Sequence, residues 1–210
     1  MLLFKRSIKL IIPLLAFKLV AQEYAILRDI SYYGKNIVDS YKSERCKLDL
    51  YYPKAINNFP TIVWFHEGGL KAGNKSVPEQ LKEKGIAVVA VNYRLHPKVK
   101  APVYIEDAAA AVAWTFKNIS KHGGDPEKII VSGSSAGGYL TLMVGLDKSY
   151  LKIYQIEAND IFALLSLTGQ TITRFTIRAE NNLPKIKPII DRFAPLYHIR
   201  AEAPLIVLYT

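Results

Sequence analysis

The chain has 210 residues, of which 50% are hydrophobic, and its formal net charge is +10. That length suffices for one α/β domain with a sizeable core, and the composition excludes a disordered or low-complexity class. The basic excess is scattered and accompanies no nucleic-acid motif, so a solvated surface is favoured over a nucleic-acid patch. The single cysteine, Cys46, excludes an internal disulfide, and no Cys/His cluster predicts a metal site.

The first part of the chain differs from the rest. Basic residues at positions 5, 6 and 9 precede an apolar run at residues 10–17, and a small residue, Ala21, follows. This is the pattern of a secretory signal peptide, and the run is too short to span a bilayer. We expect residues 1–21 to direct export to the periplasm or the outside, as a cleaved signal or an anchor. The alternative is an amphipathic N-terminal helix.

Residues 26–52 have the pattern of a β-hairpin. Residues 30–33 and 46–52 are the expected strands, and Gly34-Lys35-Asn36 is the expected turn between them. Cys46 opens the second strand, where we expect it to be a small packed side chain.

From residue 61 onward, buried-type strands alternate with helices. The expected strands are residues 61–65, 86–91, 129–131, 161–167 and 205–209. The expected helices are residues 79–84, 104–119 and 138–144, with a turn at 123–126. Such alternation indicates parallel β-α-β units with right-handed crossovers, and sites in these sheets lie beyond the carboxyl ends of the strands. The sequence therefore predicts an α/β fold for residues 22–210.

The stretch Gly133-Ser134-Ser135-Ala136-Gly137 matches the pattern Gly-x-Ser-x-Gly between an expected strand and an expected helix. In that context the motif indicates a nucleophile elbow, a strained turn that pushes the serine Oγ out of the sheet towards a base. The glycines avoid crowding the neighbouring strand and helix. We predict that Ser135 is the nucleophile and that Ser134 is the variable position. The alternative is an ordinary turn of small residues.

A second motif, His66-Glu67-Gly68-Gly69, stands at the carboxyl end of the strand at 61–65. Acyl transfer builds negative charge on a carbonyl oxygen, which two backbone N–H groups can stabilise. We expect one donor from the stretch Gly68 to Leu70 and the other from Ala136, the residue after the nucleophile. The alternative is a Gly-Gly turn, with His66 making a structural hydrogen bond.

Together these motifs resemble those of the α/β-hydrolase superfamily, most of all its carboxylesterases of the hormone-sensitive-lipase and feruloyl/acetyl-esterase kind. The resemblance covers roughly Asp49 to Thr210. It is carried by His66-Glu67-Gly68-Gly69, Asn92-Tyr93-Arg94-Leu95, Glu106-Asp107-Ala108, Gly123-Gly124-Asp125-Pro126, Gly133 to Gly138 and Pro195-Leu196-Tyr197-His198. It implies a mostly parallel sheet with helices on both faces and a serine hydrolase acting on small or carbohydrate-linked esters. It implies neither a metal nor an organic cofactor.

The resemblance also implies a triad in the order Ser, acid, His, with the acid after a strand such as residues 205–209. The one histidine that follows Ser135 is His198, which precedes that strand. Asp191 and His198 are the remaining candidates for the acid and the histidine, but both precede the strand at 205–209 in the sequence instead of following it. We therefore identify no triad acid or histidine, and we expect the chain to be incomplete at its C-terminus, since chains seldom end inside an uncovered apolar strand.

Three alternatives stay open. An amidase, arylformamidase or peptidase can use the same fold. A catalytically incomplete fragment or pseudo-enzyme would bind a ligand without turning it over. The polar stretch from Arg174 to Pro188 is either a cap over a pocket or an ordinary connecting loop. His96 and His122 have no partner pattern, and we interpret both as loop residues.

Overall fold

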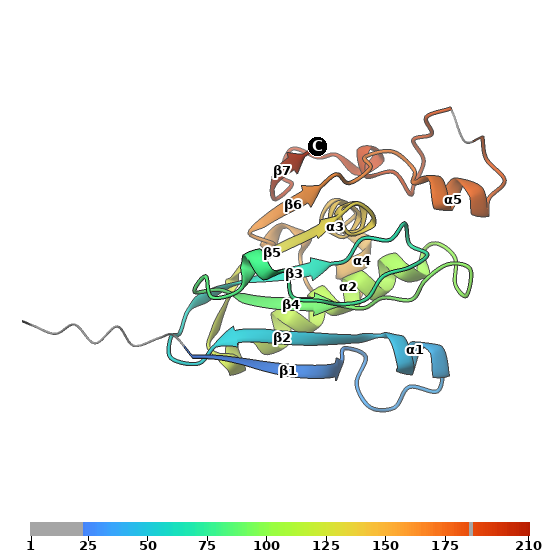
Figure 1. Cartoon of the computed structure of the whole chain (residues 1–210). Coiled ribbons are helices and arrows are strands. Elements are labelled where there is room, and N and C mark those ends of the chain that lie inside the picture. Colours follow the sequence, from blue (N-terminus) through green and yellow to red (C-terminus); the bar gives the residue numbers. More distant parts are fainter. Residues whose placement is uncertain (1–22, 185–186) are drawn as a thin grey trace, which may run out of the picture.

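A computed structural model of the chain describes residues 23–184 and 187–210. The export signal expected at residues 1–21 lies outside these residues. Within the described ranges, no helix combines the length and the apolar character needed to span a lipid bilayer. Seven strands of the described part form one sheet, in the order β1-β2-β4-β3-β5-β6-β7 (Figure 1).

The antiparallel edge of the sheet is formed by β1 (Tyr24–Ser31) and β2 (Lys47–Pro53). The expected strands do pair, but the expected tight turn at residues 34–36 is wrong. A short helix, α1 (Ser40–Arg45), lies between the strands. The side chain of Asp39 caps this helix by accepting a hydrogen bond from the Lys42 N–H at 3.0 Å, which satisfies one of the free donors of its first turn.

The remaining strands are parallel to one another. They are β3 (Phe59–Phe65), β4 (Ala87–Val91), β5 (Gly124–Ser134), β6 (Ala163–Leu167) and β7 (Leu205–Tyr209). The chain passes from β3 to β4 on one side and then crosses back to β5 on the other side of β3. The direction of winding therefore reverses between β3 and β5. In open α/β sheets, ligands bind in the crevice at such a switch point.

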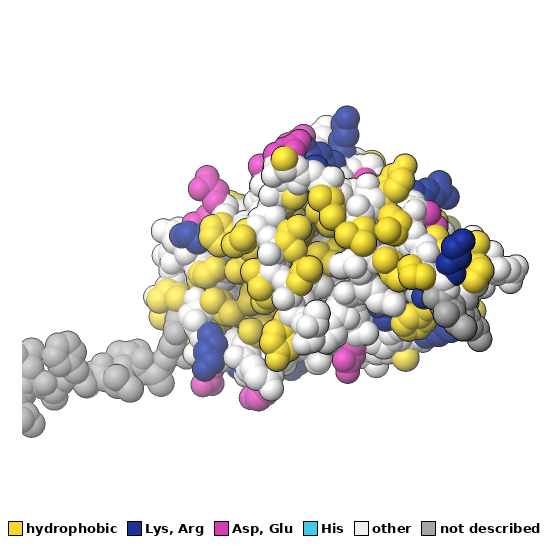
Figure 2. Space-filling model, turned by 90° about the horizontal axis from the view of Figure 1, so that it is seen from above, with side chains coloured by type: hydrophobic (Ala, Val, Ile, Leu, Met, Phe, Trp, Pro, Cys, Tyr) yellow, Lys and Arg dark blue, Asp and Glu magenta, His cyan; other side chains and the backbone are white. Residues whose placement is uncertain are grey.

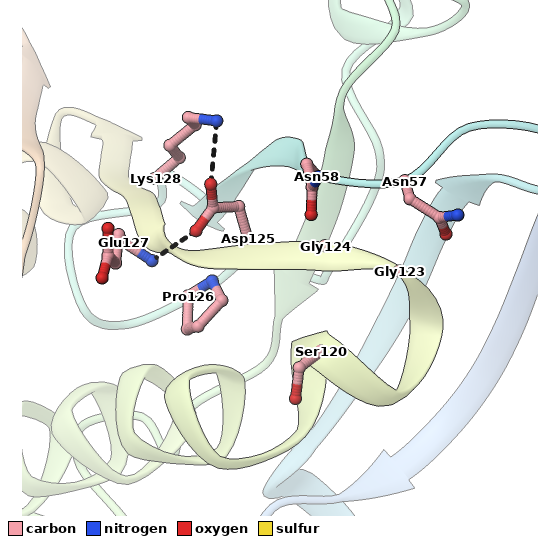
Figure 3. A pocket seen from close by; sticks show the side chains of 9 residues that line it. All are labelled: Asn57, Asn58, Ser120, Gly123, Gly124, Asp125, Pro126, Glu127 and Lys128. Carbon is pink, nitrogen blue, oxygen red and sulfur yellow. Dashed lines mark hydrogen bonds and ion pairs between the residues drawn. The ribbon is translucent and has the colours of Figure 1, made fainter.

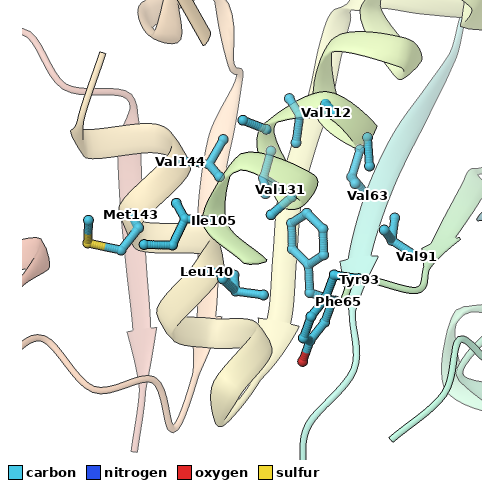
Figure 4. Close-up of a cluster of buried hydrophobic side chains, with 14 of the residues drawn as sticks. Val63, Phe65, Val91, Tyr93, Ile105, Val112, Val131, Leu140, Met143 and Val144 are labelled. Carbon is cyan, nitrogen blue, oxygen red and sulfur yellow. The ribbon is translucent and has the colours of Figure 1, made fainter. Parts of the chain in front are cut away.

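The core lies between the sheet and two long helices, α2 (Val103–Asn118) and α3 (Ala136–Leu146). Figure 4 shows side chains of β3, such as Val63 and Phe65, facing Leu140 of α3 and Val112 of α2. All four are buried. The mostly parallel sheet with helices packed on it confirms the α/β prediction. The short α4 (Ser149–Lys152) follows α3.

Two further expectations about local structure are wrong. Residues 79–84 form a single 3₁₀ turn, Glu79–Leu81, rather than a helix, because Lys82 already has extended backbone dihedrals. The turn expected at residues 123–126 is confined to Gly123, whose φ is +90°. Gly124 already pairs with Phe59 in the sheet, so β5 begins there.

A buried ion pair joins the segment after β4 to helix α2. The guanidinium of Arg94 donates to the Asp107 carboxylate through Nη2 at 2.7 Å and Nε at 2.9 Å, and the Arg94 backbone N–H donates at 3.0 Å. The Tyr33 hydroxyl donates to the same carboxylate at 2.9 Å. Asp107 is fully buried. Two of the stretches that carry the sequence resemblance are thus partners in space.

Strand β7 is the edge of the sheet farthest from β1. All five of its side chains are exposed, and all are apolar or aromatic. Figure 2, seen from this side, shows hydrophobic side chains gathered over the edge. Cys46, at the opposite side of the sheet, is fully buried, and burial raises the pKa of its thiol to about 12. Cys46 is thus a packed side chain, as expected.

Candidate active site

Ser135 lies on the turn between β5 and α3, where the sequence motif placed it. Its backbone has φ +52° and ψ −103°, a conformation that costs a residue with a Cβ about 1–3 kcal/mol and that gathers at functional sites. The flanking glycines leave no room for a side chain. A Cβ on Gly137 would meet the Phe65 carbonyl oxygen at 2.0 Å, and one on Gly133 would meet the Gly137 carbonyl carbon at 2.5 Å.

The Ser135 side chain is half-buried rather than enclosed in the core. The Ser135 N–H donates to the Leu167 carbonyl oxygen at 2.7 Å, which ties the turn to the end of β6. Among the described residues, the one hydrogen-bond partner of Ser135 Oγ is Arg174, whose Nη2 donates at 3.3 Å. The hydroxyl is therefore held at the rim of the sheet by a cation.

The loop after β3 begins beside the elbow. Phe65, the last residue of β3, is in register with Gly133 at the end of β5. The Ser134 hydroxyl donates to the Glu67 carboxylate at 3.4 Å. The structure therefore brings the two sequence motifs together at the switch point between β3 and β5.

Carbonyl groups of this loop are fixed by hydrogen bonds. The Gly68 carbonyl accepts from the Ala72 N–H at 3.0 Å, and the Leu70 carbonyl accepts from the His96 N–H at 2.8 Å. The Gly69 carbonyl accepts from the Thr176 hydroxyl at 2.6 Å. A Cβ on Gly68 would meet the Ala72 carbonyl oxygen at 2.1 Å, so this tight turn requires glycine.

The backbone N–H groups at the same place have no partner. In the described part of the chain, the N–H groups of Gly68, Gly69 and Ala136 donate to no protein acceptor. Ala136 is the first residue of α3, and the first N–H groups of a helix lack an intrahelical acceptor. Unpaired donors beside a strained serine are what stabilisation of a carbonyl oxyanion requires.

The His66 side chain packs beside the loop and hydrogen-bonds to it. Its ring stacks on Tyr93 with centroids 4.4 Å apart. Its Nδ1–H donates to the Glu67 carbonyl at 2.6 Å, and Nε2 accepts from Arg45 Nη2 at 3.2 Å. Burial, opposed by the hydrogen bond to Glu67 and assisted by the Arg45 charge, lowers the pKa of His66 to about 4. His66 is therefore neutral at pH 7 and makes structural hydrogen bonds beside the loop.

We expect the stability of the protein to fall as the pH drops from about 6.5 to about 4, with His66 responsible for part of the loss. In the unfolded chain His66 binds a proton near its ordinary pKa of 6.5, whereas the folded state resists protonation until about 4. Protons therefore favour unfolding in that window, by up to about 3 kcal/mol from this one group. Urea unfolding at several pH values measures the slope.

The matched variant for this measurement is His66→Gln, which keeps a hydrogen-bonding side chain without a titrating ring. Its unfolding free energy should depend less on pH between 6.5 and 4 than that of the wild type. Burial also lowers the pKa of His122, so a smaller slope in the same direction should remain. Identical slopes for the two proteins would contradict the assignment of His66 as buried and neutral.

The remaining candidates for a triad are not assembled at Ser135. Asp191 accepts from the Thr173 hydroxyl at 2.7 Å and from the Phe193 N–H at 2.8 Å. His198 Nε2 donates to the Arg192 carbonyl at 2.9 Å and lies 3.6 Å from Asp147. The pairing of Asp191 with His198 is therefore wrong. Of the described histidines, none hydrogen-bonds to Ser135.

The stretch from residue 174 onward lies over this site. It contains the short helix α5 (Phe175–Glu180), and Thr176 and Arg174 reach the loop and the elbow as described above. Glu180 is held by the Ala101 N–H at 3.0 Å and by the Tyr104 hydroxyl at 3.1 Å. His96 Nδ1 lies 3.0 Å from the same carboxylate, so His96 has a partner that the sequence did not reveal. These contacts favour a cap over a simple connection.

One pocket of the structure lies beside the sequence motifs, and a larger one lies away from them. One, of about 670 Å³, adjoins the elbow. It is lined by Trp64, His66, Glu67, Gly73, Asn74, Ser76, Pro78, Gln80, Ser134 and Leu167. A larger one, of about 810 Å³, lies at the amino end of β5 (Figure 3), where Asp125 pairs with Lys128 at 2.8 Å. The described residues contain no cluster of acids, histidines or cysteines that would hold a metal ion.

Comparison with known proteins identifies a family and relatives of this chain. A family model described as BD-FAE matches residues 48–203. The chain is 29% identical, over 88% of its length, to a probable carboxylic ester hydrolase, LipM, of Mycobacterium tuberculosis. It is 34% identical, over 45% of its length, to the carboxylesterase NlhH of the same species. The chain spans 47% of the first relative and 32% of the second, so about half or less of the curated relatives that it matches.

Solved structures share the fold. A structure described as a truncated form of a carbohydrate esterase from gut microbiota superimposes with a TM-score of 0.70 over 90% of this chain and 76% of its own, at 19% identity. An inhibited esterase B from Lactobacillus rhamnosis gives a TM-score of 0.69 over 88% of this chain and 65% of its own, at 18% identity.

Proposed function

The chain belongs to the BD-FAE family and has the α/β-hydrolase fold, and from that premise we propose that the protein hydrolyses carboxylic esters by acyl transfer to Ser135. The observation that carries the proposal is the strained Ser135, at the rim of the sheet, beside backbone N–H groups of Gly69 and Ala136 that have no acceptor. Carboxylic ester hydrolases among the curated relatives support it.

In this mechanism the Ser135 Oγ attacks the ester carbonyl carbon, and its proton leaves to a base. The carbonyl oxygen becomes an oxyanion, which the N–H groups of Gly68, Gly69 and Ala136 bind in this proposal. Collapse of this intermediate expels the alcohol and leaves an acyl group on Oγ, which water then removes. The described residues supply the nucleophile and the oxyanion donors, and none of them supplies a base in contact with Oγ.

We propose that the substrates are small or carbohydrate-linked esters, for a protein that works after export. The pocket beside the elbow is lined by hydroxyl, amide and carboxylate groups together with Trp64. Polar side chains around the indole ring of Trp64 suit a hydroxylated alcohol portion of an ester. One structure with the same fold is described as a carbohydrate esterase, which supports this substrate class.

We expect the protein to hydrolyse p-nitrophenyl acetate and to leave p-nitroacetanilide intact. Nitrophenolate departs without protonation, whereas an amine must be protonated by a general acid as it leaves. The described site offers no histidine at Ser135 to do so. Release of the coloured product from each compound, at equal enzyme concentration, measures the preference.

Two other results would point elsewhere. Comparable cleavage of the anilide would favour the amidase or peptidase alternative on the same fold. Cleavage of neither compound, together with no covalent labelling by a fluorophosphonate, would favour a protein that binds without turnover. The contact of Arg174, rather than a histidine, with Oγ is the observation behind that second candidate.

A further inference from the structure

Arg174 is one of the largest fully buried side chains in the protein, with 2% of its surface exposed. It stands immediately before α5, and its guanidinium reaches the nucleophile turn. Its Nη2 lies 3.3 Å from Ser135 Oγ, and its Nη1 lies 3.5 Å from the Gln170 side-chain oxygen. Both contacts are long for hydrogen bonds to a charged donor. A cation is therefore enclosed beside the nucleophile with weak partners.

In the described part of the chain, the charge of Arg174 has no counter-charge. Within the described residues, no carboxylate lies within ion-pair distance of its guanidinium, and its Nε makes no hydrogen bond. Arg94 differs, because it shares two hydrogen bonds with Asp107. Glu180, the acid of α5, instead accepts hydrogen bonds from Ala101 and Tyr104 and lies beside His96.

The neutral groups around Arg174 do not replace an anion. The ring of Phe175 lies 4.8 Å from the guanidinium carbon, and such a cation–π contact is weaker than an ion pair with a buried carboxylate. The hydroxyls of Tyr93 and Tyr139 donate to backbone carbonyls of His66 and Phe193. An enclosed cation without an anionic partner destabilises the folded state, and burial accordingly lowers the pKa of Arg174.

We propose that Arg174 binds a carboxylate that the substrate carries close to its ester bond, so that the preferred substrates are half-esters of short dicarboxylic acids. The guanidinium presents its two Nη–H groups in a planar fork, which matches both oxygens of a carboxylate, and Nη2 is the one beside the nucleophile. Because Nη2 lies 3.3 Å from the nucleophile oxygen, only a group one to three carbons from the reacting carbonyl reaches it. This inference rests on the proposed ester hydrolysis and specifies its substrate.

The direct test compares monomethyl succinate, which carries one carboxylate, with its neutral counterpart dimethyl succinate. Binding of each is measured by calorimetry in low-chloride buffer, with the full chain in which Ser135→Ala prevents turnover. We expect the half-ester to bind at least about tenfold more tightly, as a charge-assisted pair predicts. Adding Arg174→Gln should bring the ratio of the two affinities close to one.

The matched control is Arg192→Gln, which removes an exposed arginine that stacks on Phe193. It changes the net charge equally and should leave the tenfold preference intact. A preference that is absent from the Ser135→Ala protein, or one that survives Arg174→Gln, would overturn the inference. If Arg174→Gln fails to fold, Arg174→Lys keeps the charge without the fork and should retain only part of the preference.

Kinetics separate this inference from the proposed function. With Ser135 present, kcat/KM for p-nitrophenyl hydrogen succinate should exceed that for p-nitrophenyl butyrate by about tenfold. Arg174→Gln should reduce this ratio, whatever it does to either rate alone. Hydrolysis of both esters at equal rates would overturn the anion site and leave the esterase proposal standing. Selective binding of the half-ester without hydrolysis of either ester would overturn the esterase proposal and leave the anion site standing.

Discussion

Replacing Ser135 by alanine is expected to lower the hydrolysis of p-nitrophenyl acetate by about 10³-fold or more. The variant keeps the loop and the free N–H groups that bind an oxyanion, but it has no oxygen to accept the acyl group. Loss of the nucleophile costs about 10⁶-fold in kcat where a complete triad activates it. The smaller figure reflects that Arg174, and no described histidine, contacts the hydroxyl here.

The neighbouring serine provides the control. Ser134 is adjacent in sequence and donates to Glu67 instead of facing Arg174. Ser134 lines the proposed substrate pocket, but the alcohol portion of p-nitrophenyl acetate has no hydroxyl group for it to bind. Ser134→Ala should therefore leave the rate on this ester within about threefold of the wild type. A fluorophosphonate should label the wild type and the Ser134→Ala protein but not the Ser135→Ala protein. Labelling of all three would place the reactive group elsewhere and refute the assignment of the elbow.

The strand–turn–helix around Ser135 was predictable because several local signals agree there. The apolar run of Ile129 to Val131 indicates a buried strand, and small residues at positions 133 and 137 are what close packing against β3 requires. The glycines of the loop at 66–69 follow another such strand. Parallel strands bring their carboxyl ends to the same edge, so the meeting of the two motifs followed from topology alone.

Other features of the candidate site depend on contacts between segments that are distant in sequence, and no local sequence pattern predicts them. Arg174 contacts Ser135 across 39 positions, and Thr176 contacts Gly69 across 107. A buried arginine in a polar stretch looks like any exposed one in sequence, since long charged side chains are nearly always exposed. The helix α1 was missed for a related reason, because residues 34–36 have good turn composition although the connection between the two strands is longer and contains a helix.

The buried pair of Arg94 and Asp107 gives a structural role to two sequence stretches whose role the sequence alone did not show. The sequence placed Arg94 after a strand and Asp107 inside a helix, with nothing to say that they meet. In the structure, Asp107 accepts from the backbone and the side chain of Arg94. Tyr93, which immediately precedes Arg94 in the chain, stacks on His66. The pair thus fixes the segment that supports the loop of the candidate oxyanion site.

We expect Asp107→Asn to lower the free energy of unfolding by about 3–5 kcal/mol. The substitution preserves shape but removes the buried carboxylate from the Arg94 guanidinium, which has 10% of its side chain exposed. Asp39, at 3.3 Å and half-exposed, then remains as its one described acidic partner. Removing one partner of a buried pair strands a charge in a poorly solvated place, and that desolvation is the source of the cost. Denaturant unfolding monitored by tryptophan fluorescence gives the difference.

Two further variants make this expectation specific. Glu79→Gln removes an exposed partner of Lys82 and should cost less than about 1 kcal/mol, since solvent screens such pairs. The double variant Arg94→Met, Asp107→Leu should regain part of the stability lost in Asp107→Asn, because no buried charge remains without a partner. If Asp107→Asn cost no more than Glu79→Gln, the pair would be solvated, and the support of His66 through Tyr93 would have to come from the ring stack alone.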